Sequence, residues 1–158
     1  MTTQNSQAVV LEPGGGARIT VGASSLRIKA EAATTGGAVF LTETEIEAGF
    51  PGPPPHTHEH MHDMFYVLDG VLTFLVDGET IEAQPGTFVC APPGVVHTFS
   101  NRSDAPVRFL NLATPAGFEG YMRELGQAFS GRSRPDPQEM AVIASRYDFR
   151  VAAPPSGS

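Results

Sequence analysis

The sequence predicts an all-β domain of antiparallel strands, arranged as a sandwich or barrel, followed by two short helices. Three observations predict it. The 158 residues include 17 glycines and 14 prolines, which favour many turns and short strands over a helix bundle. Residues 37–48 alternate apolar and polar side chains, the period of a half-buried strand. Short β-rich runs continue to residue 113, and apolar residues then recur at helical spacing.

The strand-like runs are bounded by Pro, Gly and Asn-rich breaks. Asp69-Gly70 is a dipeptide suited to a primed hairpin turn, and Asp77-Gly78 turns the chain again. The predicted strands cover residues 17–21, 26–30, 37–48, 64–68, 71–76, 79–83, 87–91, 97–100 and 107–113. This spacing, without a long helix between the runs, is typical of a sandwich or barrel.

Two helices are predicted after the strands. Thr114-Pro115 resembles an N-cap followed by proline at the first helical position. Asp136-Pro137, with Glu139 at the third position, resembles a capping box. The apolar stripes that follow are Phe118, Tyr121, Met122, Leu125 and Phe129, and then Met140, Ile143, Ala144 and Tyr147.

These elements give one β-domain over residues 8–113 and a helical extension over 114–150. The helices are too short to fold alone and should pack on the barrel or on a partner subunit. Residues 1–7 and 151–158 are expected to be a disordered N-terminus and a flexible tail.

Composition excludes several classes of protein. The net charge of −7 offers no basic patch, so nucleic acid is not expected as a partner. No apolar run reaches the roughly 18 residues that span a bilayer, and the N-terminus lacks the pattern of a secretory signal. The single cysteine, Cys90, excludes an internal disulfide. A cytoplasmic protein is therefore expected.

The histidines are the residues whose spacing indicates a metal site. His56 and His58 are two residues apart, so an extended strand places both imidazoles on one face. His97 opens a later strand, which a hairpin could bring opposite the first pair. A carboxylate on the next inward position would complete three nitrogens and one oxygen, a ligand set that suits a divalent transition metal.

Two longer patterns contain these residues. The pattern H-x-H-x4-D-x6-G ends at Gly70, and later in the chain the pattern G-x5-P-x-G-x2-H-x3-N begins at Gly86 and matches without an insertion or deletion. The residues that carry the patterns are His56, His58, Asp63 and Gly70, and then Gly86, Pro92, Gly94, His97 and Asn101. Together they resemble the two motifs of the cupin superfamily, and the chain is most similar to small single-domain bacterial cupins related to quercetin 2,3-dioxygenase. The resemblance implies a double-stranded β-helix (jelly roll), one divalent ion of Fe, Mn, Ni, Co or Zn, and a homodimer.

The fourth ligand has three candidates. The resemblance places an acid at position 63, but the usual Glu is here Asp63, whose side chain is one methylene shorter. Some family members have one fewer residue between the His pair and the acid, which would make His62 the ligand. Water held by either side chain is the third possibility. The alternation of side chains along a strand favours Asp63, because it would lie on the same, inward face as the apolar residues Phe65 and Val67.

Several neighbours are expected around the ion. His60 and His62 otherwise suit the pocket rim, as donors to the ligands or as proton shuttles. Phe65 and Phe99 lie two residues from ligand candidates and are expected to line an apolar substrate pocket, together with Phe74 and His60.

Three functions fit such a site. The first is a dioxygenase that acts on a flavonol-like or other enolisable aromatic molecule, with Asp63 accepting the substrate's hydroxyl proton. The second is a non-redox cyclase or isomerase of the polyketide cyclase kind, in which His62 or Asp63 moves protons. The third is a small-molecule-binding protein without turnover. Oxygen uptake separates the first from the other two.

Overall fold

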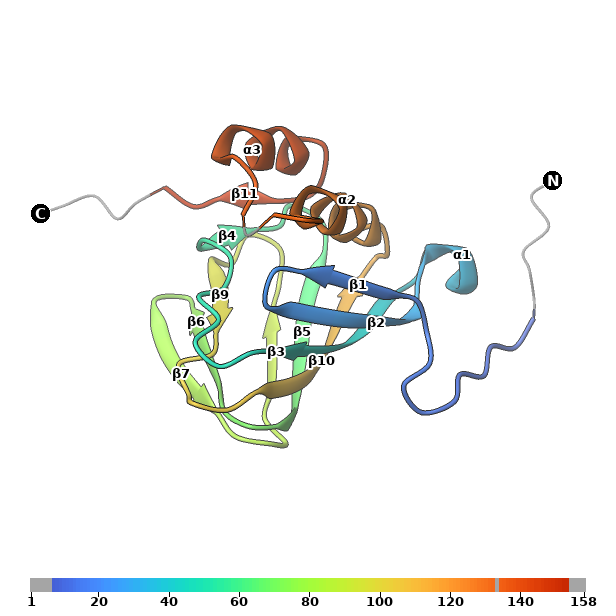
Figure 1. Ribbon diagram of the computed structural model, residues 1–158, viewed down its shortest axis with the longest axis horizontal. Helices are drawn as coiled ribbons and strands as arrows, with labels where there is room; N and C mark the ends of the chain where they lie inside the picture. Colours follow the sequence, from blue (N-terminus) through green and yellow to red (C-terminus); the bar gives the residue numbers. More distant parts are fainter. Residues whose placement is uncertain (1–6, 133, 154–158) are drawn as a thin grey trace, which may run out of the picture.

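The computed structural model describes residues 7–132 and 134–153. Within them the chain forms eleven strands and three helices, and every strand pairing is antiparallel. The predicted all-β class with C-terminal helices is therefore confirmed (Figure 1). The expected disordered residues 1–6 and most of the expected flexible tail, residues 154–158, lie outside the described residues.

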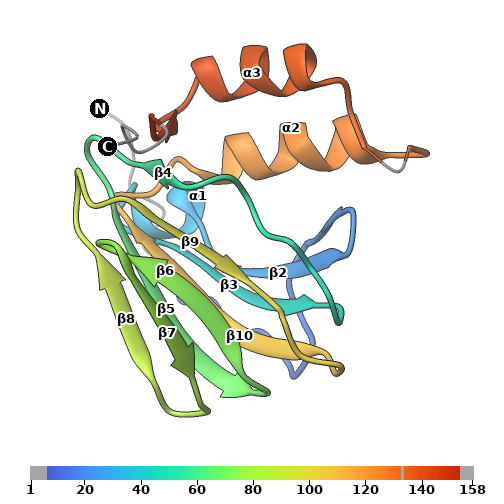
Figure 2. The same ribbon diagram turned by 90° about the vertical axis from the view of Figure 1, so that its left-hand side faces the viewer.

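Two sheets make the domain and face each other as a double-stranded β-helix (Figures 1 and 2). The larger sheet has, in spatial order, β1 (Arg18–Val21), β2 (Ser24–Ala30), β3 (Phe40–Ile46), β10 (Val107–Thr114), β5 (His62–Asp69) and β8 (Phe88–Ala91). The smaller sheet has the order β11 (Arg150–Val151), β4 (His56–Thr57), β9 (His97–Ser100), β6 (Leu72–Val76) and β7 (Glu79–Ala83).

The main core lies between the two sheets. Alternation along β5 buries every second side chain and leaves His62 and Tyr66 exposed. The buried set combines aromatic and branched residues, which favour strands and fill the space between them. Its members are Ile46, Phe65, Val67, Leu72, Phe74, Ala83, Val89, Val107 and Phe109. This core supports the strands that carry the histidines.

One predicted hairpin is wrong, and the structure shows why. Asp69-Gly70 does not join paired strands, because β5 belongs to the larger sheet and β6 to the smaller one. The tight hairpin is instead Asp77-Gly78, between β6 and β7, where Val76 pairs with Glu79. Both turn residues have positive φ, 50° and 81°, as a type I′ turn requires. The Asp-Gly dipeptide alone does not say whether the chain changes sheets.

The helices are α1 (Ala32–Thr35), α2 (Glu119–Phe129) and α3 (Pro137–Ser145). The predicted start of the first long helix at Thr114-Pro115 is wrong. Strand β10 continues through Thr114, the Thr114–Pro115 peptide is cis, and α2 begins at Glu119. The predicted start of α3 is confirmed, since the Asp136 side chain accepts a hydrogen bond from the backbone N–H of Gln138.

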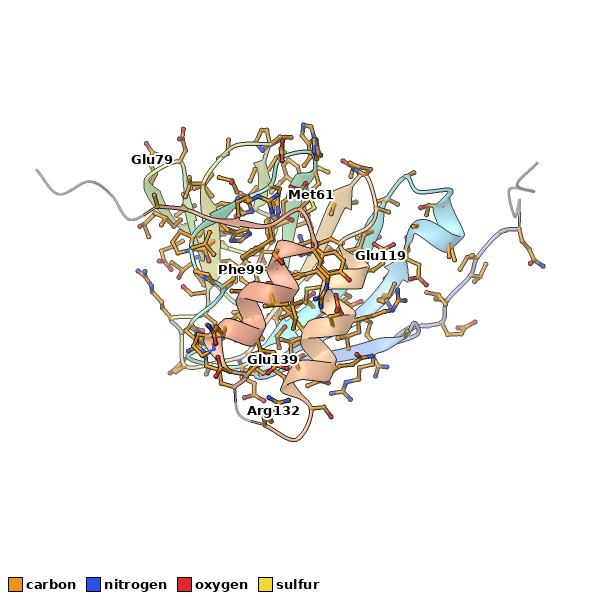
Figure 3. The ribbon with its side chains drawn as sticks, turned by 90° about the horizontal axis from the view of Figure 1, so that it is seen from above. Met61, Glu79, Phe99, Glu119, Arg132 and Glu139 are labelled. Atoms are coloured by element: carbon orange, nitrogen blue, oxygen red, sulfur yellow. The ribbon has the colours of Figure 1, made fainter. Side chains whose placement is uncertain are left out.

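Helices α2 and α3 lie across one end of the barrel (Figures 2 and 3). Seen from above, Glu119 marks the start of α2, while Arg132 and Glu139 meet where the connection enters α3 (Figure 3). The helices pack on each other and on the segment after α3 through Tyr121, Leu125, Ala128, Ile143 and Phe149. Among the described residues, no helix is both long and apolar enough for a membrane span.

Candidate metal centre

Four side chains that can bind a metal meet beneath the C-terminal helices. His56 and His58 come from β4 and the residue after it, Asp63 from β5, and His97 from the start of β9. Strands β4 and β9 are neighbours, and His56 lies directly opposite His97. The pairing expected from sequence is therefore formed, although by a sheet contact and not by a hairpin.

The geometry of the four groups suits one ion. All four residues are buried, and their ligand atoms lie within 4.8 Å of one another. Asp63 Oδ2 is 3.0 Å from His97 Nε2 and 3.3 Å from His58 Nε2. Ligands bonded to one ion at about 2.0–2.2 Å lie no more than about 4.4 Å apart, so a small inward movement would complete a site. Three imidazole nitrogens and one carboxylate form a donor set for a divalent transition metal.

Backbone carbonyls fix the orientation of all three imidazoles. The Nδ1 atoms lie 2.9 Å from Pro54 O for His56, 2.6 Å from Asp148 O for His58, and 2.9 Å from Val95 O for His97. A carbonyl oxygen only accepts hydrogen bonds, so each Nδ1 carries the proton and donates it. Each Nε2 therefore faces the centre as the atom that can bind a metal.

The glycine before β4 lets the loop that leads to the first histidine lie close to β9. Gly52 has φ +78°, and a Cβ at this position would come within 1.7 Å of Phe99 O. Next to it, Thr98 Oγ1 donates a 2.6 Å hydrogen bond to Pro53 O. Only glycine permits this approach, which sets the position of His56 relative to His97.

Burial and mutual contacts shift the ionisation of the cluster. Burial and the neighbouring His97 lower the pKa of His56 to about 3. Burial alone would also lower the pKa of His58. The hydrogen bond and the charge of Asp63 outweigh this effect and raise the pKa of His58 above its ordinary value. Burial would raise the pKa of Asp63, but the hydrogen bonds from His58 and His97 hold that pKa well below its usual range. At neutral pH, Asp63 is thus ionised and His56 is neutral.

Metal binding is therefore expected to release a proton, mainly from His58. A raised pKa means that the metal-free protein holds this proton to a higher pH, so protons compete with the ion. The apparent affinity should rise with pH by up to about tenfold per unit, and level off once the pKa of His58 is passed. Calorimetric titrations in buffers of different ionisation enthalpy measure the released proton. A binding enthalpy independent of the buffer would contradict this expectation.

Asn111 is a residue of the site that the sequence analysis missed. It lies in the middle of β10, and its Nδ2 donates to Asp63 Oδ1 at 2.8 Å and to Met64 O at 2.9 Å. These bonds turn Oδ2 of Asp63 towards the histidines. The available signal was an amide between two leucines, Leu110 and Leu112, in the middle of a strand.

Aromatic rings from the C-terminal extension cover the cluster. The ring of Phe149 stacks on His56 at a centroid distance of 4.3 Å, and Phe118 meets His58 edge-on at 5.4 Å. Tyr121 stacks in turn on Phe149 at 5.3 Å. The helical spacing of Phe118 and Tyr121 predicted only that they pack within a helix stripe, and no pattern in the sequence placed Phe149, because contacts between distant segments leave no periodic signal.

The three phenylalanines predicted to line a pocket lie deeper. Phe65 is buried, with its ring 6.5 Å from that of His97, and Phe99 packs against Phe65 at 5.6 Å. Phe74 is fully buried in the core between the sheets. Phe65 and Phe99 thus form the apolar floor beneath the cluster. Phe74 lies in the core between the sheets, with its ring 5.0 Å from that of Phe65.

The other two histidines lie outside the cluster. His62 is exposed on the outer face of β5, opposite Thr114, and His60 is exposed in the preceding loop. The alternative ligand set with His62 does not match this geometry, because one step along a strand reverses the side chain. The same alternation places His62 on the opposite face of β5 from Asp63, so its predicted catalytic role finds no support in this arrangement.

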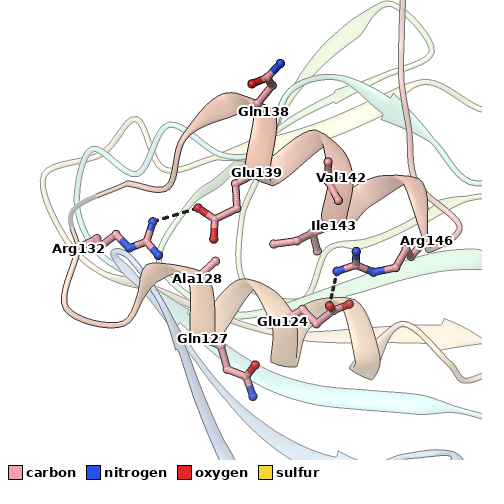
Figure 4. A pocket seen from close by; sticks show the side chains of 9 residues that line it. All are labelled: Glu124, Gln127, Ala128, Arg132, Gln138, Glu139, Val142, Ile143 and Arg146. Carbon is pink, nitrogen blue, oxygen red and sulfur yellow. Dashed lines mark hydrogen bonds and ion pairs between the residues drawn. The ribbon is translucent and has the colours of Figure 1, made fainter.

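Two surface hollows lie elsewhere. One, of about 550 Å³, lies between α2 and α3 above Ala128 and Ile143 (Figure 4). Ion pairs of Arg132 with Glu139 and of Arg146 with Glu124 lie at its sides (Figure 4). The other, of about 590 Å³, lies between β1 and α2. Neither is lined by a residue of the histidine cluster.

Comparison with known proteins agrees with this architecture. The family model described as "Cupin domain" matches residues 42–113, which include all four clustered residues. Quercetin 2,3-dioxygenase of Bacillus subtilis (strain 168) is 32% identical over 132 residues, which cover 83% of this chain. The chain belongs to the cupin superfamily. It spans only 39% of the length of that Bacillus enzyme.

Solved structures share the fold at low sequence identity. KdgF from Halomonas sp. superposes with a TM-score of 0.62 at 18% identity, over 72% of this chain and 98% of that one. The polyketide cyclase RemF from Streptomyces resistomycificus gives 0.59 at 23% identity, over 68% and 80% of the two chains. At these identities the matches support the fold alone.

Proposed function

We propose that the protein is a metal-dependent dioxygenase that acts on a flavonol-like or other enolisable aromatic small molecule. The observation that carries the proposal is the buried cluster of three imidazoles and one carboxylate, with every Nε2 aimed at the centre. The similarity to the Bacillus quercetin 2,3-dioxygenase supports the choice of reaction. The proposed ligands are His56, His58, Asp63 and His97.

A divalent ion bound there would supply a Lewis acid for the oxygen of an enolate or phenolate. Side chains of the protein would accept the proton, orient the carboxylate and exclude water. Asp63 Oδ2 accepts the substrate's hydroxyl proton, while Asn111 holds Oδ1 and so the orientation of the carboxylate. The flat rings of Phe118 and Phe149 suit an aromatic substrate and keep water from the reacting atoms.

The covering segment has to move for this reaction. Each of the four residues is at most 6% exposed, so a substrate reaches them only when the segment around Phe149 shifts. Lids of this kind commonly close over a bound substrate and complete the site.

Oxygen consumption tests the proposal. Apo-protein is loaded separately with Fe, Mn, Ni, Co or Zn, and an oxygen electrode records uptake with flavonols and other enolisable phenolics. Uptake is expected with at least one redox-active ion and not with Zn, which has no accessible redox chemistry. A cyclised or isomerised product without oxygen uptake would favour the non-redox alternative. Tight ligand binding with no product would favour a binding protein.

The homodimer and the cytoplasmic location stay predictions. Light scattering on the purified protein, coupled to gel filtration, measures the first.

A further inference from the structure

The three imidazoles are oriented in two different ways. His56 and His97 each donate to a carbonyl two residues earlier in their own segment, Pro54 and Val95. The carbonyl that accepts from His58 belongs to Asp148, 90 residues later in the chain. Two ligands are thus oriented locally, while the third depends on the C-terminal extension.

Asp148 also holds the loop between two ligands. Its Oδ1 accepts the backbone N–H of Glu59 at 2.5 Å, and its Oδ2 accepts those of His60 at 2.9 Å and Met61 at 3.1 Å. These residues connect His58 to β5, which carries Asp63. A carboxylate that accepts several backbone N–H groups makes strong, charge-assisted hydrogen bonds. The conformation of this connection therefore depends on one distant side chain.

The neighbouring residues keep Asp148 in place. Strand β11 begins two residues after Asp148 and pairs with β4, with Arg150 opposite Thr57 and Val151 opposite His56. Phe149 stacks on His56 and packs with Tyr121 of α2. Part of the segment expected to be a flexible tail is therefore a strand beside the cluster, because Val151 belongs to β11.

We propose that Asp148 is a positioning residue of the metal centre. Its carbonyl fixes the tautomer of His58, and its carboxylate fixes the loop from His58 to Asp63. The C-terminal helical extension thereby sets the affinity and geometry of a site whose ligands all lie in the barrel. The inference rests on the proposed metal site. Removal of a group that orients a ligand in this way typically lowers the metal affinity by about 10–100-fold.

The test compares Asp148→Ala and Asp148→Asn with the wild-type protein. Co²⁺ is the probe, and chelator competition measures its dissociation constant while visible absorption reports the ligand field. Asp148→Ala is expected to weaken binding by about 10–100-fold and to change the absorption bands. Asp148→Asn keeps the size of the side chain but loses the charge and one acceptor oxygen, so it should show a smaller loss in the same direction.

Asp136→Ala is the matched control. Asp136 also accepts a backbone hydrogen bond in the extension, and it lies exposed at the far end of α3 from Asp148. This variant should lower the melting temperature and leave the Co²⁺ affinity and spectrum unchanged.

The possible failures are distinct. Unchanged affinity and spectrum in both Asp148 variants would overturn the inference and leave the metal site standing. An equal loss in Asp136→Ala would also overturn it, because general loosening of the helices would then explain the effect. A wild-type protein that binds no Co²⁺ or other divalent ion would overturn the proposed site itself.

Discussion

Replacement of His97 by alanine is expected to abolish stable metal binding and, with it, turnover. His97 offers one of the three inward-facing Nε2 atoms, and its ring touches those of His56 and His58. Loss of a direct ligand should cost more than loss of a residue that orients one, so the affinity should fall by more than about 100-fold. Elemental analysis after dialysis measures the retained metal, and the oxygen electrode measures turnover.

The same substitution should also lower stability. His97 is buried and donates from Nδ1 to Val95 O, while its Nε2 lies beside Asp63. Its removal leaves a cavity and takes one partner from a buried carboxylate, which together cost about 2–4 kcal/mol. Denaturant unfolding of the metal-free proteins measures this difference.

His60→Ala is the matched control, since it removes the same side chain from an exposed position in the loop. The backbone N–H at position 60 would still donate its hydrogen bond to Asp148 Oδ2. This variant should retain metal content, turnover and stability. Full metal content in His97→Ala would contradict the proposed ligand set.

Local pattern accounts for the parts of the site that were predictable. The i, i+2 spacing of His56 and His58 and the alternation along β5 are properties of single strands, so sequence alone could place these side chains. The wrong turn at Asp69-Gly70 and the late start of α2 have a common cause. Whether a strand continues, pairs or changes sheets is decided by its neighbours in space.

Contacts between distant segments could not be predicted in this way. Asp148 meets His58 across 90 residues, and Asn111 meets Asp63 across 48. Neither belongs to a motif or a periodic stripe. Each is nevertheless a half-buried polar residue between apolar or aromatic neighbours in the chain: Asn111 lies between two leucines, and Asp148 between Tyr147 and Phe149. A polar group that is partly withdrawn from water usually has a hydrogen-bond partner, so such positions indicate where a site receives support from outside its motifs.

Asp63→Asn is expected to separate metal binding from chemistry. The variant keeps the three imidazoles and an amide oxygen that can still bind the ion, so at saturating metal the protein should load, with a smaller loss of affinity than His97→Ala. The amide cannot accept the substrate's hydroxyl proton. Loss of a general base typically costs about 10²–10⁴-fold in rate, so turnover of the metal-loaded variant should fall by that factor.

Asp69→Asn is the control for this change. It makes the same replacement at the exposed end of the same strand, six residues from Asp63, and should leave metal content and rate unchanged. Rates are compared at saturating metal and normalised to the bound ion. A rate per bound ion equal to that of the wild type would limit Asp63 to a ligand and remove it as the base. A total rate that falls only in proportion to the metal content has the same meaning, because Asp63 would then act only as a ligand of the ion.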